Sequence, residues 1–139
     1  MRLTDRTPSY VGTWDINNPC GGYFEMFIDA NNGVFKGEII DCIGDADIEG
    51  TRTGNELKFV KRYREGQCTP GAVRSDVTYK GIIRGDEIIG FFAVGGYGER
   101  MYMRQTHVQS PLELGMIQLA AEKKYLSEIK ELGKRFFKE

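Results

Sequence analysis

The chain has 139 residues, enough for one domain with its own core. Its 19 basic and 20 acidic residues leave a formal net charge of −1, which excludes a general role in binding nucleic acid or an anionic membrane surface. No apolar run is long enough to span a membrane, and the first residues lack the apolar stretch of a signal peptide. We therefore expect a cytoplasmic protein with reduced cysteines.

Residues 10–105 alternate between short strand-like segments and turns. The expected strands are 10–16, 23–28, 34–40, 46–51, 57–63, 77–83, 87–94 and 100–105. No helical segment separates them, so neighbouring strands are expected to pair antiparallel in chain order. Eight such strands can close into a barrel, which removes the exposed sheet edges. The predicted fold is mainly β: an eight-stranded antiparallel up-and-down β-barrel formed by residues 1–109.

Residues 110–139 predict one long amphipathic α-helix. Ser110 is a candidate N-cap, Pro111 occupies the first helical position, and Glu113 is placed for a capping box. The strand 87–94 is apolar on both faces, so its outer face needs a cover. We expect the helix to pack there within a single domain. A straight helix of this length would outreach a small barrel, so its end at Phe136 and Phe137 is also a candidate contact with a partner subunit.

The connections between the strands predict two unequal barrel ends. Those at 30–33, 52–55 and 84–86 are short and share one end. Those at 17–22, 42–45, 64–75 and 95–98 share the other end and are mostly longer or richer in glycine. Short turns close an end, whereas longer loops usually surround a binding site. The second end is therefore predicted to be open.

All three cysteines, Cys20, Cys42 and Cys68, lie in these open-end connections. Three thiolates meeting there could hold a zinc ion, with a carboxylate or water as fourth ligand. Two of them could instead pair under oxidising conditions. Their spacing lacks the C-x-x-C pattern of zinc sites, and three unrelated cysteines explain it as well. We expect neither a metal nor a cofactor.

Strand alternation also predicts which side chains line the interior. If Leu57 and Phe59 point inward, so do Lys61 and Tyr63 near the open end, next to Tyr79 on the following strand. A lysine and two tyrosines suit an anionic or hydroxylated head group. The apolar body of such a ligand would contact Met26, Phe92 and Trp14. Alternatively, Lys61 extends to the rim and the tyrosines bond backbone or water, since a one-residue register shift inverts every assignment.

The segment Gly12-Thr13-Trp14 resembles the G-x-W motif of the calycin barrels, the lipocalins and avidins. In lipocalins the tryptophan packs at the barrel floor, under a basic residue from near the end of the last strand. The resemblance therefore implies that Trp14 lies at the closed end with Arg104 across it. A helix after the eighth strand is also lipocalin-like, while the short strands suit an avidin-like barrel. Members of this group typically bind small, often hydrophobic ligands.

Three functional hypotheses follow. The first is a barrel that binds a small, mainly apolar ligand with an anionic or hydroxylated group. The second is an interaction or oligomerisation module with a packed interior, acting through the C-terminal helix as a homodimer. The third is a small isomerase or lyase on a calycin-like barrel. We do not expect an enzyme, because the sequence offers no identifiable acid–base pair.

Overall fold

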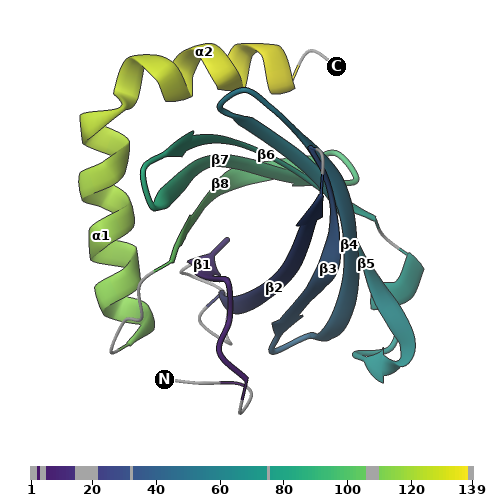
Figure 1. The fold of residues 1–139 in the computed structure, drawn as a ribbon. Coiled ribbons are helices and arrows are strands. Elements are labelled where there is room, and N and C mark those ends of the chain that lie inside the picture. Colours follow the sequence, from purple (N-terminus) through teal and green to yellow (C-terminus); the bar gives the residue numbers. More distant parts are fainter. Residues whose placement is uncertain are drawn as a thin grey trace.

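The structure is a computed structural model that describes residues 3, 6–14, 22–31, 33–74, 76–105 and 110–137. Within these residues, eight antiparallel strands close into a barrel in chain order, and two α-helices follow (Figure 1). The prediction of a mainly β, up-and-down barrel is confirmed. The strands are β1 (Tyr10–Thr13), β2 (Tyr23–Asn31), β3 (Val34–Asp41), β4 (Gly44–Thr53), β5 (Glu56–Cys68), β6 (Val77–Arg84), β7 (Glu87–Val94) and β8 (Tyr97–Arg104).

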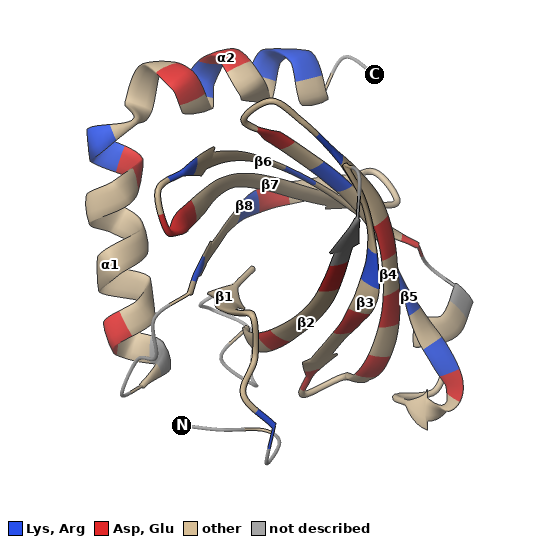
Figure 2. Cartoon of the chain, viewed as in Figure 1, with Lys and Arg blue, Asp and Glu red and all other residues tan. Residues whose placement is uncertain are grey.

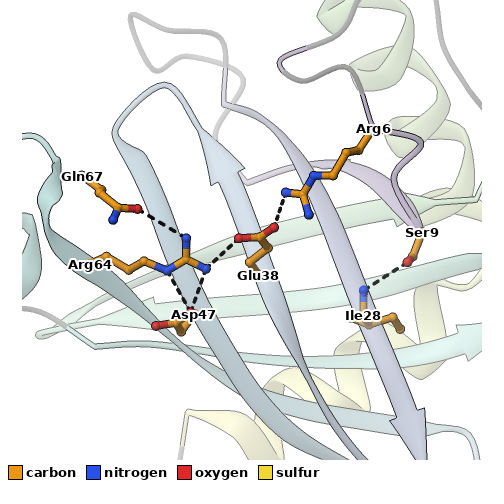
Figure 3. Close-up of polar contacts among 7 residues, drawn as sticks. All are labelled: Arg6, Ser9, Ile28, Glu38, Asp47, Arg64 and Gln67. Atoms are coloured by element: carbon orange, nitrogen blue, oxygen red, sulfur yellow. Dashed lines mark hydrogen bonds and ion pairs between the residues drawn. The ribbon is translucent and has the colours of Figure 1, made fainter.

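Strand β5 continues through part of the segment expected to be the longest loop. It pairs with β4 as far as Cys68, opposite Gly44, after a register irregularity in which residues 64–67 of β5 lie opposite the single β4 residue Asp45. Outer-face ion pairs hold this extension in place. The Arg64 guanidinium lies 2.6 Å from a Glu38 oxygen on β3 and 2.8 Å from an Asp47 oxygen on β4 (Figure 3). These contacts join three neighbouring strands, a tertiary effect that the turn-like composition of the segment does not reveal.

Side chains alternate between a core inside the barrel and a second core outside it. The inner core includes Phe24, which packs against the backbone of β1 at Gly12. A Cβ atom on Gly12 would lie 2.3 Å from the Phe24 ring and 2.6 Å from the Tyr102 carbonyl oxygen. The glycine of the G-x-W segment is therefore required by close packing. The inner core comprises Trp14, Phe24, Met26, Phe35, Ile39, Ile48, Leu57, Phe59, Val77, Tyr79, Ile88, Phe92, Met101 and Met103.

The C-terminal segment forms two helices, α1 (Pro111–Lys124) and α2 (Leu126–Phe136), so the prediction of one long helix is wrong. The expected N-cap is present, because the Ser110 side chain accepts a hydrogen bond from the Glu113 N–H at 3.2 Å. The break falls at Tyr125, where φ is −111° and ψ is 29°. Figure 1 shows α1 along one side of the barrel and α2 across its top. Neither described helix is long and apolar enough to cross a membrane.

Packing explains a break that has no glycine or proline within three residues of it. The turn at Tyr125 keeps α2 on the barrel, where its apolar face joins the outer side chains of β6 and β7 in a shared core. The Phe91 ring stacks on Phe136 at 6.1 Å between centroids and faces Phe137 edge-on at 5.3 Å. Phe136 is buried in its own chain, whereas Phe137 is 53% exposed, so a contact with a partner subunit there stays a prediction. The outer core comprises Val11, Tyr23, Ile82, Ile89, Phe91, Tyr102, Leu114, Ala121, Ile129, Leu132 and Phe136.

The contribution of this outer core can be measured on two leucines of the same helix. Leu132 is fully buried, whereas Leu126 is 42% exposed. We expect Leu132→Ala to lower the free energy of unfolding by about 2–5 kcal/mol, because it leaves a cavity under α2. Leu126→Ala is the control and should change it by less than about 0.5 kcal/mol. Urea denaturation followed by circular dichroism gives both values, and two equally small effects would contradict this packing.

Candidate functional site

A cavity of about 200 Å³ lies at the barrel end formed by the β3–β4 turn, the β5–β6 connection and the end of β7. This is the end that the loop lengths predict to be open. The lining is almost wholly apolar, apart from one lysine and the polar tips of its aromatic neighbours. It comprises Trp14, Ile43, Lys61, Tyr63, Ala72, Val77, Tyr79, Phe92 and Val94.

Five of the six predicted ligand-binding residues therefore share one cavity wall. They come from the end of β1 and from β5, β6 and β7, and they are Lys61, Tyr63, Tyr79, Phe92 and Trp14. The sixth, Met26, is fully buried in the inner core and does not line the cavity. Their role in binding a ligand stays a prediction.

The polar centre of the site is a buried triangle of side chains. The Lys61 ammonium, on a residue that is only 2% exposed, lies 3.2 Å from Asp41 Oδ2. It also donates a hydrogen bond to the Tyr63 hydroxyl oxygen at 2.8 Å. The Tyr63 hydroxyl in turn donates to the same Asp41 oxygen at 2.7 Å. Lys61 therefore does not extend to the rim; its charge is neutralised inside the barrel.

Asp41 is the member of this triangle that sequence reasoning missed. Its other carboxylate oxygen, Oδ1, accepts the backbone N–H groups of Ile43 at 2.9 Å and Gly44 at 3.1 Å. One carboxylate thus secures both the β3–β4 turn and the lysine. A usable signal was present, because Asp41 continues the inward alternation of Phe35 and Ile39 along β3.

A small residue on the intervening strand makes this reach possible. Ala46 on β4 is paired with Ile39 on β3 and with Tyr63 on β5. Because the Ala46 side chain is a single methyl group, the side chains of Lys61 and Tyr63 can extend across β4 to Asp41 on β3. The contact between Asp41 and Lys61 thus depends on the register of three consecutive strands, β3, β4 and β5.

Three aromatic rings surround the ammonium group. Lys61 Nζ lies 4.6 Å from the ring centroid of Tyr63 and 5.5 Å from those of Trp14 and Tyr79. These are distances at which a cation is attracted to the face of an aromatic ring. Trp14 also meets Phe92 edge-on, with centroids 5.9 Å apart. The rings give the cavity rigid, flat walls around a single cation.

The position of Trp14 corrects the expectation taken from the G-x-W resemblance. Trp14 follows β1 at the cavity end of the barrel and not at a closed floor. Arg104 is paired in register with Val11 and belongs to the other end of β8. The cation near the tryptophan ring is therefore Lys61, since β1 runs toward the cavity.

The protonation states favour recognition over proton abstraction. Burial acts to lower the pKa of Lys61, but Tyr79 and the Asp41 carboxylate outweigh it and raise this pKa above its ordinary value. Burial also raises the pKa values of Tyr63 and Tyr79, although the Lys61 charge opposes it. At neutral pH the lysine is an ammonium and both phenols are protonated. These groups can donate hydrogen bonds but are poor bases or nucleophiles.

The two cysteines that the structure describes differ in state, and neither belongs to a group of potential metal ligands there. Cys20 lies outside the described residues, Cys42 is disulfide-bonded, and Cys68 is a free cysteine at the end of β5. The expectation of a reduced thiol is therefore wrong at Cys42. Among the residues that the structure describes, no group of three potential metal ligands occurs.

Comparison of the chain with protein-family models, with curated proteins and with solved structures found no significant match. The class of protein is therefore defined by its architecture: an eight-stranded antiparallel closed β-barrel with C-terminal helices.

The buried triangle predicts that stability falls at alkaline pH. Lys61, Tyr63 and Tyr79 all bind their protons more tightly in the folded state, so the unfolded chain releases protons first as pH rises. The stabilisation is present below the unfolded pKa values, 10.0 for tyrosine and 10.5 for lysine, and is lost above them. Urea denaturation between pH 8 and pH 11, values chosen to bracket pKa values of about 10, measures this loss.

The matched variants are Tyr63→Phe and Tyr97→Phe. Tyr97 is half exposed, so removing its hydroxyl leaves the buried triangle intact. We expect Tyr63→Phe to reduce the alkaline loss of stability and Tyr97→Phe to leave it as in the wild type. An identical pH dependence in both variants would contradict the assignment to the triangle.

Proposed function

We propose that this protein binds a small, largely apolar molecule in the cavity at the open end of its barrel. The observation that carries the proposal is a buried Lys61–Asp41 ion pair on the wall of an otherwise apolar cavity. Replacing a buried ion pair by apolar side chains is often neutral or even stabilising. The pair is thus a poor device for stability alone, and its position beside an open volume favours a role in recognition.

Barrel geometry and cavity size are consistent with this role. An eight-stranded barrel is just wide enough either to be filled by side chains or to hold one small ligand. Here the inner core fills most of the barrel interior, and a volume of about 200 Å³ remains at the end that carries the cavity. A dry apolar cavity of roughly 150 Å³ accommodates benzene. The ligand is therefore about the size of one ring with a short substituent.

A pair of variants at adjacent positions tests occupancy of the cavity. Ala72 lines the cavity, whereas its neighbour Val73 does not and is 43% exposed. Ethylbenzene is the probe, and emission from Trp14, the single tryptophan, reports binding inside the barrel. We expect saturable changes in wild type and in Val73→Phe, and weakened binding in Ala72→Phe because the new ring fills the space.

Native mass spectrometry of protein from its own host provides an independent measurement. A bound small molecule that is retained by Val73→Phe and lost by Ala72→Phe would support the proposal. Bare-chain masses for all forms, together with no saturable response to ethylbenzene, would refute it.

A second candidate function is homodimerisation, supported by an apolar stripe on α1. Leu112, Met116 and Leu119 are each at least 60% exposed and are spaced four and three residues apart, so they share one helix face. In the isolated chain only one side is covered, and the stripe remains exposed.

Charges at the two ends of α1 favour a second copy of the chain as the occupant. Glu113 lies in the first turn, and Lys123 and Lys124 lie in the last (Figure 2). Two α1 helices packed antiparallel about a twofold axis would place the acidic start of each beside the basic end of the other. A twofold interface is self-complementary in this way.

Sedimentation velocity tests this second candidate. We expect Met116→Glu combined with Leu119→Glu to dissociate the dimer, because it buries charges at the centre of the stripe. Val34→Glu, at another exposed apolar residue, the first of β3, is the control and should leave the dimer intact. A monomeric wild-type protein at micromolar concentration would refute dimerisation through α1.

A further inference from the structure

Two buried hydrogen-bond donors beside the cavity have no partner among the described residues. They are the Tyr79 hydroxyl and the indole N–H of Trp14. Tyr79 is fully buried, Trp14 is 8% exposed, and both side chains line the cavity. A buried donor without an acceptor is destabilising, and native proteins leave few of them. Two such donors around one small volume suggest that a bound molecule supplies the acceptor.

The Lys61 ammonium offers a third donor at the same place. An ammonium group carries three protons. Among the described groups, Lys61 Nζ has two hydrogen-bonding partners, Asp41 Oδ2 and the Tyr63 hydroxyl. The third proton can reach the Tyr79 hydroxyl oxygen or a group in the cavity, which Lys61 and Tyr79 both line.

The acceptors of this cluster are already in use. Asp41 Oδ1 accepts two backbone N–H groups, and Oδ2 accepts from Lys61 and Tyr63. The Tyr63 oxygen accepts from Lys61. Among these groups only the Tyr79 oxygen remains as an acceptor, against three donors. A ligand that itself donates a hydrogen bond would therefore find few free acceptors in the cavity.

The net charge of the site separates a charged acceptor from a neutral one. The Lys61 ammonium and the Asp41 carboxylate cancel each other inside the barrel. A carboxylate ligand would bring one more charge into a buried volume without a counterion, which carries a large desolvation penalty. An uncharged acceptor uses the same three donors without that penalty.

We infer that the ligand is a small, uncharged ring compound that presents a carbonyl oxygen to Lys61, Tyr79 and Trp14. This inference rests on the proposed function, since it names the chemistry of a ligand in the same cavity. It differs from both head groups expected from the sequence. An anionic group adds an unpaired charge, and a hydroxyl adds a donor where acceptors are scarce.

Four probes of nearly equal shape separate the possibilities: acetophenone, 1-phenylethanol, benzoate and ethylbenzene. They place a carbonyl, a hydroxyl, a carboxylate or no polar group beside the same ring. Isothermal titration calorimetry on the full chain gives their affinities. We expect acetophenone to bind most tightly, by about tenfold over ethylbenzene, a difference equivalent to one or two net hydrogen bonds.

Conservative variants assign the effect to the proposed donors. Tyr79→Phe and Trp14→Phe each keep a ring on the cavity wall and remove one donor. Each should lower the ratio of the acetophenone affinity to the ethylbenzene affinity about fivefold, because the ratio cancels any change in cavity shape. Tyr97→Phe, at a half-exposed tyrosine that does not line the cavity, is the control for loss of a hydroxyl. Thermal melts establish that each variant is folded.

The outcomes are distinguishable. Equal affinities for acetophenone and ethylbenzene would overturn the carbonyl inference while leaving a ligand-binding cavity. Tightest binding of benzoate would mean an anionic ligand, and tightest binding of 1-phenylethanol a hydroxylated one; either would overturn it. Binding of none of the four probes would overturn the proposed function itself.

Discussion

Closure of eight strands into one hydrogen-bonded ladder is the constraint on which the other features depend. Each strand then has one face inside the barrel and one outside, and successive side chains along a strand point alternately inward and outward. The interior cannot hold all the apolar residues of β6, β7 and β8, so their outer faces need a cover. The helices supply it, and the break at Tyr125 follows because a straight helix would leave the curved barrel wall.

The same alternation places charged residues inside the barrel, where a core is normally apolar. Lys61 follows Leu57 and Phe59 along the inward face of β5, and Asp41 follows Ile39 along that of β3. Each would be costly to bury alone, so the two sites are physically interdependent. Their contact beside an unfilled volume distinguishes the two barrel ends more clearly than loop length does. It also neutralises the cavity wall, which limits the charge that a ligand can carry.

The position of Trp14 shows the limit of what a three-residue motif can predict about structure. Gly12 has a clear packing role under Phe24, and that role requires only a glycine within a strand. The floor position and the partner Arg104 depend on strand direction and on the register with β8, which three residues do not encode. In this chain the tryptophan lies beside Lys61 and becomes part of the candidate site.

Sequence alone determined the number of strands, their order, the helix start at Ser110 and the inward position of Lys61, Tyr63 and Tyr79. These depend on local periodicity and on capping, which are readable within a few residues. Tertiary structure decided the end of β5, the break at Tyr125, the location of Trp14 and the pairing of Lys61 with Asp41. Each of these depends on contacts between strands or layers that are distant along the chain. Such contacts exist only once the strands have paired in register and the helices have packed on them, because that assembly decides which residues meet.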